Sequence, residues 1–206
     1  MFTENQIQDL NEAFKNAKPS EIIRKALELS SKAVVTTNFR PYEAAILHAV
    51  NKEKSEIAVV WCDTGYNTPQ TYRHANQVID ALKLNVSLYV PKQTAAYRDV
   101  VMGIPSVDAP EHALFTEQVK LEPFRRAMEA HKPEVWFTNL RQGQTAFRDS
   151  IGIFSLSKDG ILKVSPFYYW SDADLDTYLE EHDLPNEFKY FDPTKALENR
   201  ECGLHA

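Results

Sequence analysis

The chain has 206 residues, of which 43% are hydrophobic and 25% are charged, a composition typical of one soluble globular domain. No apolar run approaches the ~20 residues that cross a bilayer, and the N-terminal stretch lacks the basic-then-apolar order of a secretory signal. A net charge of -6 argues against extended nucleic-acid binding, and two cysteines argue against a disulfide framework. We therefore expect a cytoplasmic protein that binds neither membrane nor nucleic acid.

Apolar periodicity predicts strands and helices that alternate along the chain. In chain order we expect helices at 7–14 and 20–29, a strand at 33–39, a helix at 42–50, a strand at 56–65, a helix at 68–84, a strand at 85–90, a helix at 114–131, a strand at 134–140, a hairpin over 151–167 and a helix at 171–182. This alternation predicts a three-layer α/β fold, a mainly parallel twisted sheet with helices on both faces. We expect one domain over 1–190 and a flexible C-terminal tail over 191–206.

Polar residues follow the predicted strands, where ligands bind in sheets of this kind. The segment TTNFR offers the hydroxyls of Thr36 and Thr37, the amide of Asn38 and the guanidinium of Arg40 directly before a helix. A helix N-terminus supplies unpaired N–H groups, so this segment suits a phosphate. The alternative is an ordinary loop in which Thr37 or Asn38 caps the helix. The loop has no glycine, so it is not a Walker-type P-loop.

The second strand ends in CDTGY, which holds Asp63 and Gly65. Asp63 can accept a hydrogen bond from an amine or hydroxyl, and Gly65 lets the backbone approach a ligand closely. The alternative is a turn in which Asp63 bonds to its own backbone. Cys62 lies in the apolar run AVVWC, so we expect a buried small hydrophobe rather than a nucleophile.

The fourth strand is followed by LRQGQTAFR, which holds Arg141, Gln144 and Arg148. Guanidinium groups match phosphate and sulfate oxygens, so this segment suits an anion, although solvated surface arginines are an equal alternative. In the last eight residues, NRECGLHA, Arg200 and His205 can lower the pKa of the Cys202 thiol. The alternative there is a disordered tail with an incidental thiol.

Five sequence segments match, in order and spacing, the motifs of one enzyme family. They are DTGYNTPQTYR, KLEPFRRAM, WFTNLRQGQTAFR, KVSPFYYWSDADLDTYLEEHDLP and, near the C-terminus, RECGLH. The second-strand segment is similar to the family's DTGY-x-x-P-E-T-Y-R, and RECGLH looks like its catalytic motif. With these segments, which agree over about residues 34–184 and again at the tip, the chain resembles the phosphoadenylyl-sulfate (PAPS) reductases.

The resemblance implies an adenine nucleotide α-hydrolase-like fold and the reduction of 3'-phosphoadenylyl sulfate to sulfite and adenosine 3',5'-bisphosphate. In that reaction the Cys202 thiolate attacks the sulfuryl sulfur, and a thioredoxin or glutaredoxin dithiol then reduces the S-sulfocysteine. It also implies a homodimer. Iron–sulfur reductases of adenylyl sulfate carry further cysteines, whereas this chain has only Cys62 and Cys202, so we expect no cluster and no bound metal.

The resemblance implies catalytic roles for three residues of the tail, Cys202, Arg200 and His205. The residues that it implies for substrate binding lie at strand ends and in one helix. They are Thr36, Thr37, Asn38, Phe39, Asp63, Gly65, Lys120, Arg141, Gln144 and Arg148.

The chain also departs from the family pattern. Arg40 and Pro41 stand where the first loop is expected to have glycine, Gln142 replaces a second arginine, and Asn139 replaces a glycine. The segment before RECGLH is shorter than usual and lacks a glycine- and threonine-rich substrate loop. Two alternatives therefore stay open, a cluster-free adenylyl-sulfate reductase and a nucleotide-binding member with altered or lost activity.

Overall fold

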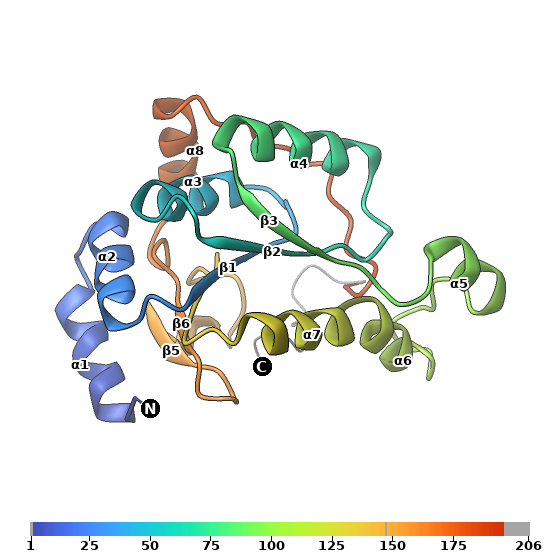
Figure 1. Ribbon diagram of the computed structural model, residues 1–206, viewed down its shortest axis with the longest axis horizontal. Coiled ribbons are helices and arrows are strands. Elements are labelled where there is room, and N and C mark those ends of the chain that lie inside the picture. Colours follow the sequence, from blue (N-terminus) through green and yellow to red (C-terminus); the bar gives the residue numbers. More distant parts are fainter. Residues whose placement is uncertain (1, 147, 196–206) are drawn as a thin grey trace.

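The computed structural model describes residues 2–146 and 148–195 and shows one six-stranded sheet in the order β3-β2-β1-β4-β6-β5 (Figure 1). All neighbouring strands are parallel except β5 and β6, so the predicted mainly parallel sheet is confirmed. The strands are β1 (Ala33–Thr37), β2 (Ala58–Cys62), β3 (Asn85–Tyr89), β4 (Val135–Phe137), β5 (Phe154–Leu156) and β6 (Leu162–Val164).

The helices α4 and α8 begin where local capping signals predict. Thr68 accepts a hydrogen bond from the backbone N–H of Thr71, and Pro69 occupies the first turn of α4. Ser171 caps α8 in the same way. The helices are α1 (Glu4–Phe14), α2 (Pro19–Leu29), α3 (Glu43–Glu53), α4 (Pro69–Leu82), α5 (Ala95–Val101), α6 (His112–Thr116), α7 (Glu122–His131) and α8 (Asp172–Glu181).

Helices cover both faces of the sheet, which gives the three predicted layers (Figure 1). α3 packs on β1 and contacts α2, α4 and α8 on one face, whereas α7 packs on β2 and β3 on the other. Neighbouring strand residues point to opposite faces, so Val35 lies in the larger core and Val34 in the smaller one beside Trp136. Within the described ranges, no helix combines the length and the apolar character that crossing a membrane would take.

Three features of the fold were not predicted. The hairpin joins the main sheet, because β6 pairs in parallel with β4 and leaves β5 as an antiparallel edge strand. α5 occupies a stretch without a regular pattern. The predicted helix 114–131 is interrupted by a π-helical turn, Glu117–Leu121, in which the N–H of Glu122 donates to the carbonyl of Glu117. Pro123 has no N–H for a regular helix, and the wider turn accommodates it.

Candidate active site

A cleft opens at the carboxyl ends of β1, β2 and β4. The chain proceeds from β1 to β2 on one side and returns to β4 on the other side, so this is the point where the strand order reverses. Ligands of α/β sheets bind at such points. The space between the lining atoms of the cleft is about 760 Å³, and part of it is open solvent. Its lining includes Thr36, Thr37, Asn38, Arg40, Val60, Cys62, Lys120, Phe124, Trp136, Leu140, Arg148, Tyr190, Asp192 and Lys195.

A second, more polar cavity adjoins the cleft. Three basic residues, Arg40, Arg148 and Lys195, line both cavities and therefore form their common wall. The other residues of the second cavity are Arg141, Gln142, Gly143, Gln144, Thr145, Trp170, Ser171 and Asp172. The first cavity thus offers apolar and aromatic walls, and the second offers donors suited to anions.

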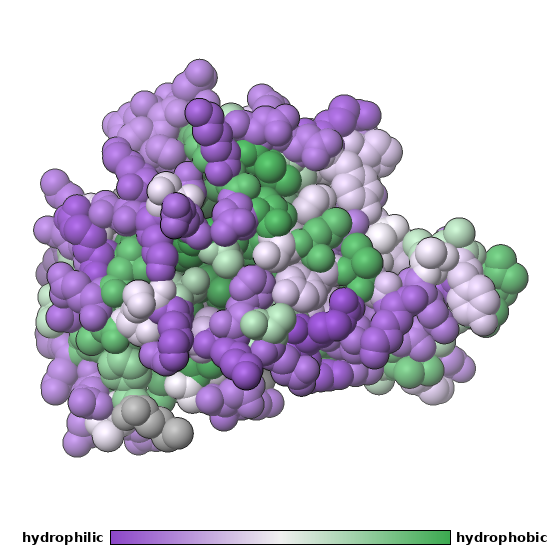
Figure 2. Space-filling view, in the orientation of Figure 1, coloured by the Kyte–Doolittle hydropathy of each residue, from purple (hydrophilic) through white to green (hydrophobic). Residues whose placement is uncertain are grey.

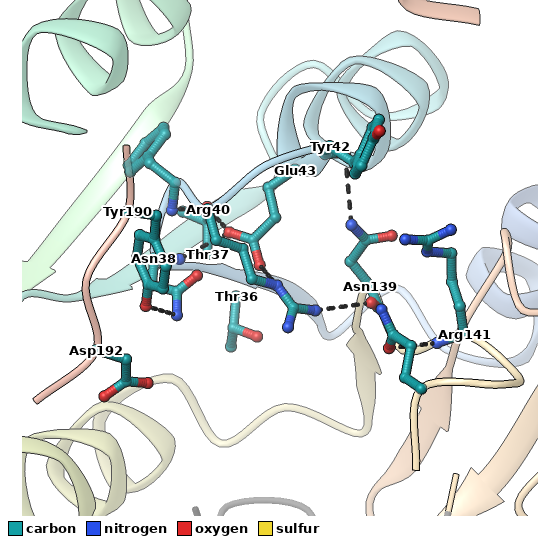
Figure 3. A network of polar contacts seen from close by, with 12 residues as sticks. Thr36, Thr37, Asn38, Arg40, Tyr42, Glu43, Asn139, Arg141, Tyr190 and Asp192 are labelled. Atoms are coloured by element: carbon teal, nitrogen blue, oxygen red, sulfur yellow. Dashed lines mark hydrogen bonds and ion pairs between the residues drawn. The ribbon is translucent and has the colours of Figure 1, made fainter. Parts of the chain in front are cut away.

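The carboxylate of Glu43 organises the loop after β1 (Figure 3). It accepts hydrogen bonds from Thr37 Oγ1 at 2.7 Å, from the backbone N–H of Asn38 at 2.9 Å and from Arg40 Nε at 3.0 Å. Glu43 is buried and is the first residue of α3. The loop and helix terminus that were expected to hold a phosphate therefore already hold an internal carboxylate.

The same loop contains two residues in the left-handed backbone region, Phe39 with φ of 54° and Tyr42 with φ of 69°. Aromatic residues rarely adopt this conformation, so the loop stores strain. Phe39 is 1% exposed and packs edge-to-face on Trp61 with ring centroids 4.9 Å apart. Its side chain belongs to the core and not to the cleft. Thr36 lines the cleft and accepts from Trp136 Nε1 at 2.9 Å.

Asp63 and Gly65 form a local turn. The Asp63 carboxylate accepts from the backbone N–H of Gly65 at 2.9 Å, from Asn67 Nδ2 at 2.8 Å and from the Tyr72 hydroxyl at 3.0 Å. Burial, followed by the charge of Asp63, raises the pKa of Tyr72 to about 12, so this hydroxyl remains a donor. The backbone-bonded turn is the alternative that the sequence left open. Neither residue lines the two cavities, and their contact with a ligand stays a prediction.

The segment that follows β4 in the chain brings three polar residues together, Arg141, Gln144 and Arg148. Gln144 Oε1 accepts from the Arg141 backbone N–H at 3.2 Å and from the Arg148 guanidinium. The Arg141 guanidinium pairs with Asp172 at 2.6 Å and lies over the Tyr42 ring at 5.4 Å. Arg141 is 9% exposed and Arg148 is 4% exposed, which excludes the alternative of solvated surface arginines. The Nε of Arg141 is buried and has no hydrogen-bond partner among the described residues, so this donor is available to an anion in the second cavity.

Lys120 reaches the cleft from the π-helical turn. Its ammonium lies 2.5 Å from Asp192 Oδ2 and 3.3 Å from Thr194 Oγ1. Burial alone would raise the pKa of Asp192, but the Lys120 charge and the hydrogen bonds of Thr194 outweigh it and the pKa lies below its ordinary value. By contrast, the charges of Lys92 and Arg126 form exposed ion pairs with Glu122, as a helix's solvated face would.

The two cysteines lie in different parts of the chain. Burial raises the pKa of the Cys62 thiol to about 12, so Cys62 stays protonated at neutral pH even though it lines the cleft. This agrees with the prediction that Cys62 is not a nucleophile, but the residue is half-buried at the cleft and not fully buried as predicted. The predicted nucleophile Cys202 and its neighbours Arg200 and His205 lie outside the described residues.

The model of the phosphoadenosine phosphosulfate reductase domain matches residues 32–191, most of the chain. The chain belongs to this family. A phosphoadenosine 5'-phosphosulfate reductase of Photobacterium profundum is 28% identical, with 97% of this chain and 88% of that protein aligned. A second such reductase, from Synechococcus, is 30% identical over 87% of this chain and 78% of the relative. The predicted family and enzyme class, a phosphoadenylyl-sulfate reductase, are confirmed.

Solved structures bear out the fold of this family member. The phosphate complex of a PAPS reductase from Candida auris superimposes with a TM-score of 0.80 at 24% identity, covering 90% of each chain. A U34-tRNA thiolase from Methanococcus maripaludis matches with a TM-score of 0.58 at 9% identity, covering 91% of this chain and 69% of its own. These likenesses confirm the predicted adenine nucleotide α-hydrolase-like fold.

Three residues of the candidate site were not predicted from the sequence. Tyr190 and Asp192 come from a segment that shows no periodicity, and their partners Asn38 and Lys120 are far away in the sequence. Glu43 was read only as part of a helix. A carboxylate in the first turn of a helix, six residues after a threonine at a strand end, is a signal that could have found it.

Proposed function

We propose that the chain reduces 3'-phosphoadenylyl sulfate to sulfite and adenosine 3',5'-bisphosphate. The observation that carries this proposal is the pair of adjoining cavities with a common basic wall of Arg40, Arg148 and Lys195. Val60, Phe124 and Trp136 offer the first cavity the apolar surface that a nucleoside requires. The donors of the second cavity suit the phosphate and sulfate groups of such a substrate.

In the first step of the proposed reaction, Cys202 of the C-terminal tail is the nucleophile. The Cys202 thiolate attacks the sulfuryl sulfur, the bond from that sulfur to the bridging oxygen breaks, and its electron pair leaves on the phosphate of adenosine 3',5'-bisphosphate. The buried arginines hold the charge that develops on the leaving phosphate. Arg200 and His205 favour the thiolate through their positive charge or hydrogen bonds. A dithiol of thioredoxin or glutaredoxin then supplies two electrons, releases sulfite and restores the Cys202 thiolate as the dithiol becomes a disulfide.

The reaction is proposed to need no bound metal or iron–sulfur cluster. The whole sequence contains two cysteines, too few for the four thiolates of a cluster. The electrons must then come from an external dithiol, and thioredoxin or glutaredoxin in the cytoplasm supplies that chemistry. We further propose that the chain consists of a domain over 1–190 and a C-terminal tail over 191–206, of which residues 192–194 are buried against the domain.

A homodimer is proposed as the working form. Apolar side chains are exposed on and after α5, including Val100 at 86% and Val101 at 59% exposure, and Figure 2 shows hydrophobic surface at this end of the molecule. Exposed apolar patches mark contact surfaces. Light scattering of the purified protein measures its mass in solution and so tests the oligomeric state. A dimer is expected, and a monomer at micromolar concentration would contradict it.

A cluster-free adenylyl-sulfate reductase is the second candidate. Gln142 supplies no charge to the second cavity, and Glu43 already uses donors of the first loop, so fewer groups are free for phosphates. Comparison of kcat/KM for the two nucleotides, with thioredoxin as reductant, separates the candidates. A charged hydrogen bond contributes about 1.5–3 kcal/mol, so we expect a preference of at least about tenfold for the 3'-phosphorylated substrate. Equal values would favour adenylyl sulfate.

A further inference from the structure

A segment without regular secondary structure, residues 186–195, crosses the carboxyl ends of the sheet. We call it the C-terminal strap. It is held to the body of the domain at four places that belong to different elements. The anchors are Asn186 to the backbone N–H of Tyr42, the carbonyl of Lys189 to Thr68, Tyr190 to Asn38, and Asp192 to Lys120.

Of the four anchors, the contact of Asp192 with Lys120 is a buried ion pair. The side chains of Lys120 and Asp192 are 8% and 5% exposed, and their charged atoms lie 2.5 Å apart. Asp192 also accepts from the backbone N–H and the hydroxyl of Thr194, at 3.0 Å and 2.6 Å. Removing one partner of a buried ion pair leaves an uncompensated charge and is strongly unfavourable. Of the four anchors, Asp192 is therefore the one at which a substitution disturbs the buried charges.

This anchor lies at the cleft itself. Lys120, Tyr190 and Asp192 line the cleft, and Lys195 lines both cavities. Cys202 follows Lys195 by seven residues, a span of at most about 25 Å at ~3.3–3.6 Å per residue. The point at which the strap is fixed therefore decides how much of the cleft Cys202 can reach.

We propose that Asp192 is a positioning residue for the reductase reaction. Its ion pair with Lys120 fixes the strap across the cleft and so sets the point from which the chain that carries Cys202 departs. This inference rests on the proposed function. Because the strap has no helical or sheet hydrogen bonds, loss of the anchor releases the strap locally and leaves the sheet folded. The nucleotide then still binds, but the thiol is delivered less often and in the wrong orientation.

A competing role for Asp192 makes a different prediction. If its carboxylate were simply a stand-in for a substrate anion at Lys120, removing its charge would tighten nucleotide binding. The two roles can therefore be distinguished by measuring the affinity for nucleotide and the rate of Cys202 sulfonation. A matched control lies on the same strap, since the Lys189 side chain is exposed and the contact to Thr68 uses its backbone carbonyl.

The experiment compares Asp192→Asn with Lys189→Ala and the unaltered chain. The dissociation constant of adenosine 3',5'-bisphosphate is measured by calorimetry, and the rate of Cys202 sulfonation by 3'-phosphoadenylyl sulfate is followed by intact mass in a single turnover. For Asp192→Asn we expect binding within threefold of the unaltered chain and a rate at least tenfold lower. Lys189→Ala is expected to change neither quantity.

Hydrogen exchange supplies a readout that is independent of activity. In Asp192→Asn the amides of residues 189–195 should exchange faster, and those of β1 should not change. Unaltered exchange of the strap, an unaltered sulfonation rate, or binding that changes tenfold in step with the rate would each overturn the positioning role. Failure of the unaltered chain to sulfonate Cys202 would instead overturn the proposed function, and the inference with it.

Discussion

Arg40 donates from Nε to Oε1 of Glu43 at 3.0 Å, and its second guanidinium nitrogen donates to the carbonyl of Asn139 at 2.9 Å (Figure 3). Arg40 thereby ties the loop after β1 to the segment after β4, across the point where the strand order reverses. Its position on the wall between the two cavities follows from this pair of contacts. Arg40, which stands where the family's loop is expected to have glycine, therefore makes hydrogen bonds that hold this loop in place.

Glu43→Gln is expected to loosen this loop. Glutamine retains the shape of the side chain, but its single carbonyl oxygen cannot serve Thr37, Asn38 and Arg40 together. Leaving a buried donor unpaired costs about 1–3 kcal/mol, and the strained backbone at Phe39 loses its support. Denaturant unfolding should show a loss in this range, with weaker binding of adenosine 3',5'-bisphosphate.

Glu53→Gln is the matched control on the same helix. Glu53 pairs with Arg24 at 3.4 Å on the surface, and such pairs contribute about 0–1 kcal/mol. If Glu43→Gln were no less stable than Glu53→Gln, the organising role of Glu43 would be wrong.

Arg141→Ala is expected to weaken the binding of adenosine 3',5'-bisphosphate about 10- to 100-fold, the value of one charged hydrogen bond. Asp172→Asn is the counterpart, because it removes the carboxylate that shares the Arg141 guanidinium at 2.6 Å. That variant should bind as well as the unaltered chain or better. Calorimetry with the bisphosphate measures both, and equal affinity of Arg141→Ala and the unaltered chain would remove Arg141 from the site.

Stability should fall as the pH drops below about 6.5, the ordinary pKa of histidine. Burial, followed by the charges of His182 and Lys52, lowers the pKa of His48. Its Nδ1 lies 2.8 Å from the hydroxyl of Tyr178, whose pKa burial raises to about 12, so this hydroxyl stays protonated and carries no negative charge that would favour a charged imidazole. The unfolded chain therefore binds more protons than the folded chain below this pH.

His48→Gln should flatten this dependence. Urea midpoints measured between pH 7.5 and 5 should decline less steeply in the variant, because one proton-binding difference has been removed. The same slope in both proteins would show that His48 does not contribute to the acid sensitivity.

Much of the fold could be predicted because its signals are local. The caps at Thr68 and Ser171 and the apolar runs of β1 and β2 lie within the elements that they specify. The pairing of β6 with β4 could not be predicted, because it places Val135 opposite Leu162 and these residues lie in segments that are far apart in the sequence. α5 was missed because a short and largely exposed helix leaves no apolar stripe.

Some residues of the candidate site could likewise be predicted from the sequence, and others could not. Residues in and after the ends of the strands, such as Thr37 in β1 and Arg148 in the segment that follows β4, could be predicted to lie near one another because parallel strands end at one edge of a sheet. Asp192 could not, since its partner Lys120 lies 72 residues away and the strap has no periodic pattern. Phe39 was placed in the site from its loop, but its side chain points into the core against Trp61.

The most direct test of the proposed reaction is the intact mass of the protein after incubation with 3'-phosphoadenylyl sulfate in the absence of reductant. We expect one added sulfonate, located on Cys202 by peptide mapping, absent from Cys202→Ser, and removed as sulfite when reduced thioredoxin is added. Bound nucleotide without any adduct, as a family member with lost activity would show, or an adduct on Cys62 instead, would contradict it.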